Sequence, residues 1–71
     1  MNKSRAQQEQ ELIDKYLNQV VSFKLPKTTV IGKINRISFW PEHGEELVTI
    51  EVMNKQFKSD LEYFEENCII L

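Results

Sequence analysis

The feature that most restricts the fold of this chain is a change in hydrophobic spacing near residue 20. Before this point the apolar residues have the spacing of one helix face, and they are Leu12, Ile13, Tyr16, Leu17 and Val20. After it, apolar and polar residues alternate as in a half-buried strand, beginning with Val21-Ser22-Phe23-Lys24-Leu25. The pattern predicts an amphipathic helix over residues 4–19, with Ser4 as its N-cap, and β structure over residues 20–71.

The alternation continues beyond Pro26 and predicts a long second strand over residues 30–39. Ile34 and Ile37 are three residues apart, and both reach the core if a β-bulge lies at Asn35-Arg36. Gly32 would ease the bend of this strand. Proline and glycine in Trp40-Pro41-Glu42-His43-Gly44 then predict a turn.

Residues 47–53 form the most regular alternation in the chain and predict a third strand, with a tight turn at Asn54-Lys55 and a short strand over 56–58. Ser59-Asp60-Leu61-Glu62 has the form of a capping box and predicts a short helical turn. Asn67 is expected to close this turn in the left-handed conformation. A last short strand is expected over residues 68–71.

This order of elements, with Gly32-Lys33-Ile34-Asn35-Arg36-Ile37 reading as glycine-x-hydrophobic-x-x-hydrophobic, resembles the Src-homology-3-like (SH3-like) small barrels. The resemblance covers roughly residues 20–71. It implies a mainly β fold: a closed, small, five-stranded SH3-like barrel with an N-terminal amphipathic α-helix and a short helical turn before the last strand. The first helix resembles the Sm-like branch, which includes bacterial RNA chaperones. Those proteins carry a Lys-His pair in the fourth strand and a glycine turn after the first, where this chain has Phe57-Lys58-Ser59 and Pro26-Lys27-Thr28.

The length of 71 residues predicts one domain over residues 1–71, near the lower size limit for folding without disulfides or metals. No apolar run reaches the roughly 18 residues of a membrane span, and the first eight residues lack the apolar stretch of a secretory signal. With a single cysteine, Cys68, the chain is expected to work in a reducing compartment, and we predict a cytoplasmic protein with no membrane association.

The sequence predicts no enzyme, no cofactor and no metal site. His43 is the only histidine, and it lies in an acidic turn that supplies no rigid catalytic partners. Cys68 precedes Ile69 and Ile70, which predicts a buried thiol without a catalytic role. A barrel of this size fills its interior with side chains and has little room for a ligand.

Three binding functions remain open. The first is a protein-interaction or regulatory accessory module, in which Trp40, Pro41 and Tyr63 contact a protein partner as exposed aromatic and apolar residues. The alternative is a single-stranded nucleic-acid-binding barrel, because residues 22–40 carry a net charge of +4 and residues 41–71 a net charge of −6. The basic residues and the stacking aromatic that would carry it are Lys24, Lys33, Arg36 and Trp40, with Lys27 beside them. The third is a homo-oligomer formed through helix docking or edge strands.

Overall fold

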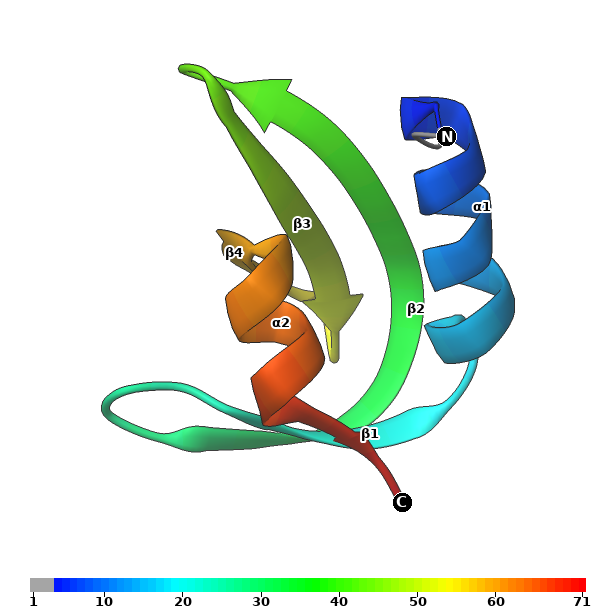
Figure 1. Cartoon of the computed structure of the whole chain (residues 1–71). Helices are drawn as coiled ribbons and strands as arrows, with labels where there is room; N and C mark the ends of the chain where they lie inside the picture. The colour runs from blue at the N-terminus through cyan, green and yellow to red at the C-terminus, as the bar shows by residue number, and fades with distance from the viewer. Residues whose placement is uncertain (1–3) are drawn as a thin grey trace.

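The computed structural model describes residues 4–71, with the side chains of all of these but Glu42. Over this range the chain is mainly β, with a helix before the first strand and a short helix before the last (Figure 1). The elements in chain order are α1 (Arg5–Tyr16), β1 (Val20–Lys24), β2 (Thr29–Glu42), β3 (Glu45–Val52), β4 (Lys55–Asp60), α2 (Leu61–Asn67) and β5 (Cys68–Ile70).

The strands form one antiparallel sheet in the order β4-β3-β2-β1-β5, and the long β2 joins its two halves. Its first residues pair with β1 and its later residues pair with β3. The register shifts between Ile34 and Arg36, which confirms the predicted bulge at Asn35 and leaves both Ile34 and Ile37 buried. Figure 1 shows that β2 is strongly curved along its length.

Gly32 is required on the inner side of this curve. A Cβ atom placed on Gly32 would lie 2.7 Å from Cγ1 of Val52, which is closer than real Cβ contacts. Any other residue at this position would therefore force the Val52 side chain, or the strand that carries it, to shift. This close approach of β2 and β3 is possible because Gly32 has no side chain, in agreement with the expected role of Gly32 at the bend.

The predicted closure of the barrel is wrong, because the sheet ends at β4 on one side and at β5 on the other. The segment between these two strands is α2, which contacts β1, β3, β4 and β5. A helix with its own internal hydrogen bonds therefore connects the two edge strands, and no β4–β5 ladder forms. The sheet is curved and open.

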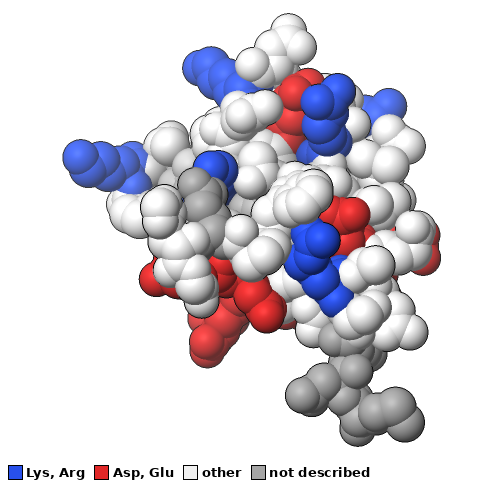
Figure 2. Space-filling model, turned by 90° about the horizontal axis from the view of Figure 1, so that it is seen from above, with Lys and Arg blue, Asp and Glu red and all other residues white. Residues whose placement is uncertain are grey.

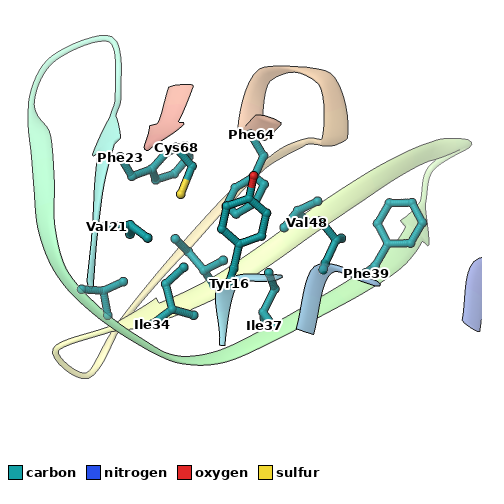
Figure 3. Close-up of a cluster of buried hydrophobic side chains, with 12 residues drawn as sticks. Tyr16, Val21, Phe23, Ile34, Ile37, Phe39, Val48, Phe64 and Cys68 are labelled. Carbon is teal, nitrogen blue, oxygen red and sulfur yellow. The ribbon is translucent and has the colours of Figure 1, made fainter. Parts of the chain in front are cut away.

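One hydrophobic core fills the space enclosed by the curved sheet and the two helices (Figure 3). Phe23, Phe39 and Phe64 are its largest fully buried side chains. The ring of Tyr16 meets that of Phe64 edge-on at 4.9 Å between centroids, so α1 and α2 contact each other across the core. Both helices contribute to the buried set, as do all strands other than β4. The buried residues are Leu12, Tyr16, Val21, Phe23, Ile34, Ile37, Phe39, Val48, Ile50, Val52, Phe64 and Cys68.

The N-terminus of α1 agrees with prediction and its C-terminus does not. Ser4 caps the helix, and Gln7 completes a reciprocal capping box that was not predicted. The helix ends at Tyr16, earlier than expected, because Asn18 takes a left-handed conformation (φ 67°). Val20 was assigned to the helix face, but it is the first residue of β1 and its side chain is 47% exposed.

Both tight turns differ in detail from the prediction. The turn expected over residues 40–44 consists of His43 and Gly44 alone, at φ values of 53° and 80°, and Trp40 and Pro41 lie within β2. The second turn is Met53-Asn54, one residue earlier than predicted, and both residues again have positive φ values. Two consecutive positive φ values are typical of the two-residue hairpins that match strand twist.

The short helix α2 begins one residue later than the predicted capping box. Asp60 is the N-cap, and its carboxylate accepts a hydrogen bond of 2.7 Å from the backbone N–H of Tyr63. Ser59 instead belongs to β4. Asn67 is the last helical residue and is not left-handed, and its side chain donates to the carbonyl of Tyr63.

Candidate functional site

Trp40 is the most exposed aromatic side chain in the described part of the chain, at 57% exposure. It lies on the outer face of β2, next to the buried Phe39, because successive side chains of a strand point to opposite faces. The guanidinium carbon of Arg5 lies 4.4 Å from the centroid of the Trp40 ring, which is a cation–π contact. The Arg5 guanidinium therefore covers part of the indole, which still presents more than half of its surface.

Side chains from the first turns of α1 also bond to the backbone of Phe39, the residue before Trp40. The carboxylate of Glu9 accepts a hydrogen bond of 2.9 Å from the backbone N–H of Phe39. The Arg5 guanidinium donates to the Phe39 carbonyl at 3.4 Å. Two side chains of α1 thus bind the edge of β2 beside Trp40, which a hydrophobic pattern alone does not reveal.

Pro41 follows Trp40 in β2 and pairs with Glu46 of β3. The backbone N–H of Phe39 points away from β3, and Pro41, two residues further on, has the same orientation. Proline therefore removes no hydrogen bond from the β2–β3 ladder, and it is exposed. Pro41 alternates to the opposite face of β2 from Trp40, so the structure does not bring these two side chains to one face. We call Arg5, Trp40 and the half-buried Leu47, which lies opposite Trp40 on β3, the tryptophan corner.

Tyr63 does not join this corner. It lies on α2 and is half-buried, where an exposed position was expected. Its hydroxyl donates a hydrogen bond of 2.7 Å to the backbone carbonyl of Lys24, and its ring packs edge-on against Phe23. These contacts connect α2 to the end of β1, so the hydroxyl already has a partner within the chain.

The basic residues of the nucleic-acid hypothesis are all exposed, and the structure brings some of them together. The bulge turns Arg36 outward, so Lys33, Arg36 and Trp40 lie on one face of β2. Lys24 lies on the same side of the neighbouring β1, and Lys27 lies in the loop that follows. Glu51 of β3 is the register partner of Arg36, so an acidic residue lies opposite this arginine. On the face seen in Figure 2, the basic side chains stand apart and acidic groups lie among them.

The two residues with potential chemistry lie apart. His43 is exposed in the β2–β3 turn. Cys68 is a free, buried thiol in β5, and burial raises its pKa to about 11 while the Lys15 ammonium opposes that rise. Among residues 4–71, no group of three histidine, cysteine or acidic residues is placed to hold a metal ion.

Sequence reasoning missed an apolar patch on the outer face of β2, β1 and β5. The cross-strand register places Ile31, Ser22 and Ile69 in one row. The next row on the same face holds Lys33, Val20 and Leu71. The four apolar side chains are between 47% and 67% exposed. The available signal was the run Cys68-Ile69-Ile70-Leu71, which is apolar at every position and so must expose part of itself in any strand that ends a sheet.

A groove of about 360 Å³ lies between α1 and α2. Leu12, Tyr16 and Leu61 line its floor, and charged residues of both signs line its rim. Since Leu12 and Tyr16 are already buried in the core, the groove offers a partner little additional apolar surface.

Comparison with known proteins identifies no relative: no family model matches the chain, and neither a curated protein nor a solved structure does. Within residues 4–71, neither helix has the length and apolar character needed to cross a membrane.

Proposed function

We propose that this chain is a non-catalytic protein-binding module, acting as an interaction or regulatory accessory protein, and that the tryptophan corner contacts the partner. The observation that carries the proposal is the position of Trp40, which is 57% exposed and held by Arg5. Tryptophan and arginine are the residue types most enriched among the residues that dominate binding energy at protein interfaces. An indole that already contacts a guanidinium before binding loses less conformational entropy when a partner covers it than an unrestrained one does.

The surroundings of Trp40 favour a protein over a phosphate backbone. Leu47 extends the apolar surface beside Trp40, while Asp60 is the register partner of Leu47 on β4 and Glu9 lies beside Phe39. An apolar centre with a polar rim is the usual anatomy of a protein interface. Carboxylates at the same place would repel phosphate.

The fold-level proposal is an SH3-like architecture, open between β4 and β5. The order of the strands and the short helix before the last strand support this resemblance. The single buried thiol supports a reducing, cytoplasmic compartment as its place of action.

The test compares three baits immobilised at equal density: wild type, Trp40→Ala and Ile31→Ala. Ile31 is the matched control because its side chain is also 57% exposed and also lies on the outer face of β2. We expect proteins captured from native cells by the wild type to remain bound to Ile31→Ala and to fall at least tenfold on Trp40→Ala, measured by quantitative mass spectrometry. Equal capture by all three baits, or no protein captured by the wild type, contradicts the proposal.

A second candidate function, single-stranded nucleic-acid binding, is favoured by one observation: Lys33, Arg36 and Trp40 lie along one face of β2. We expect this candidate, if correct, to give anisotropy changes with labelled oligonucleotides that weaken as salt rises. The double variant Lys33→Glu with Arg36→Glu would then abolish binding. Absence of salt-sensitive binding at low and moderate salt eliminates this function.

A further inference from the structure

One face of each helix builds the groove between α1 and α2. The α1 residues that line it recur at spacings of three and four along a single helix face, and they are Gln8, Glu11, Leu12, Lys15 and Tyr16. On α2, Leu61 and Glu65 are four residues apart and line the opposite wall. The rings of Tyr16 and Phe64 meet at 4.9 Å, so core packing sets the position of one wall relative to the other. The groove is therefore formed before any ligand enters it.

The hydroxyl of Tyr16 is a polar group that the fold leaves without a partner. Tyr16 is only 2% exposed, and its hydroxyl makes no hydrogen bond within residues 4–71. The hydroxyl of Tyr63, by contrast, donates to the carbonyl of Lys24. Figure 3 shows the ring of Tyr16 extending from α1 with its oxygen directed toward α2, and Tyr16 lines the groove between the two helices. Since groups this deeply buried are normally hydrogen-bonded, this hydroxyl is placed to bond to a molecule in the groove.

The charges of the groove have both signs. The ammonium nitrogen of Lys15 lies 5.2 Å from the centroid of the Tyr16 ring, so two hydrogen-bond donors stand on the same wall. Glu65 lies on the opposite wall, and Glu11 lies one turn before Lys15 on α1. A simple anion would be attracted by the ammonium and repelled by two carboxylates, and a simple cation would be repelled by the ammonium. A small ligand that carries one carboxylate and one ammonium complements both walls.

We propose that this groove binds a free amino acid with a small apolar side chain, in its zwitterionic form. The carboxylate of the ligand accepts hydrogen bonds from the Lys15 ammonium and the Tyr16 hydroxyl. Its α-ammonium donates to the Glu65 carboxylate, and its side chain contacts Leu12 and Leu61. A protein C-terminus lacks the ammonium and a protein N-terminus lacks the carboxylate, so neither complements both walls. The groove volume of about 360 Å³ is near the lower end for small-molecule sites, which suits a ligand of this size.

An NMR titration of the full chain with L-leucine tests the site. We expect saturable shifts of the backbone amides of Leu12, Tyr16 and Leu61, with a dissociation constant on the order of millimolar, because so small a ligand has little binding energy. L-leucine amide lacks the carboxylate, and N-acetyl-L-leucine lacks the ammonium. Each should bind about tenfold more weakly, since each loses a hydrogen bond between charged groups. No saturable binding of L-leucine, or equal binding of the three compounds, overturns the proposal.

Variants assign each ligand group to its residue. Lys15→Gln should remove the preference for L-leucine over its amide, and Glu65→Gln should remove the preference over the N-acetyl compound. Glu62→Gln is the matched control, because Glu62 is exposed on α2 outside the groove, and it should bind as the wild type does. An unchanged preference in Lys15→Gln or in Glu65→Gln overturns the assignment.

Tyr16→Phe separates binding from folding. It keeps the ring in the core and removes a hydroxyl that has no partner in the described chain, so the urea midpoint should not fall. Affinity for L-leucine should fall severalfold in the same protein. Unchanged affinity in Tyr16→Phe contradicts the role of the hydroxyl. Trp40→Ala should bind L-leucine as the wild type does, so this site and the tryptophan corner can fail independently.

Discussion

The hydroxyl of Tyr63 shows how a residue expected at a binding surface acts instead within the fold. It donates to the carbonyl of Lys24 from a position 39 residues later in the chain. We predict that Tyr63→Phe lowers the free energy of unfolding by about 1 kcal/mol, because one hydrogen bond is lost and the ring is kept. Urea denaturation measures the loss, and capture of a partner should be unchanged. A variant as stable as the wild type that fails to bind would contradict this structural role.

Cys68 adds a pH-dependent contribution to stability. Burial raises the pKa of its thiol from the ordinary 9.0 to about 11, with Lys15 opposing, so the folded chain holds this proton more tightly than the unfolded chain. The contribution is complete below pH 9 and is lost as pH rises toward 11. We predict that the free energy of unfolding of the wild type falls relative to that of Cys68→Val as pH rises across this window, measured by urea denaturation. The variant shares all other titrating groups, and a constant difference would contradict the assignment.

Alternation of apolar residues predicted the strands well, because a strand that packs on one face must repeat every two residues. The bulge at Asn35 was also predictable, since Ile34 and Ile37 cannot both be buried without an extra residue between them. Element ends were less accurate. The turn at His43-Gly44, the end of α1 at Tyr16 and the cap at Asp60 depend on local backbone conformations that several residue types adopt.

The helix α1 covers an edge of β2 where no strand pairs with it. Asn18 and Gln19 bond to the backbone of Ile34, and Glu9 accepts from the N–H of Phe39 near the other end of the helix. We predict that Glu9→Ala speeds hydrogen exchange at the Phe39 amide and lowers the free energy of unfolding by about 1–2 kcal/mol. Glu9→Gln keeps an acceptor oxygen and should retain most of the protection. Equal exchange in the wild type and in Glu9→Ala, measured by NMR, would contradict this edge cover.

The candidate surfaces were only partly predictable, because exposure of an apolar residue depends on which strands end the sheet. Trp40 was identified from its type and place, but its cation–π partner Arg5 lies 35 positions earlier, where no pattern connects the two. The outward position of Ile31 follows from alternation. Its proximity to Ile69 follows only from the order β2-β1-β5.

The entire chain depends on a few aromatic contacts, because a protein of 71 residues has a free energy of unfolding of roughly 4–10 kcal/mol. Phe64 is 1% exposed and contacts the rings of Tyr16 and Phe23, so it joins α2 to α1 and to β1. We predict that Phe64→Ala lowers the free energy of unfolding by about 3–5 kcal/mol, which leaves little or no folded protein in mild urea.

Trp40→Ala is the matched control, because it truncates a large aromatic side chain that is 57% exposed and whose main described partner is the Arg5 guanidinium. We expect it to cost about 1 kcal/mol or less, so the variant stays folded for the capture experiment. Urea denaturation followed by circular dichroism measures both variants. Equal losses of unfolding free energy in Phe64→Ala and Trp40→Ala would contradict a special role for the contact between the two helices. A much larger loss in Phe64→Ala would show that Phe64 stabilises the fold, whereas Trp40 is free to contact a partner.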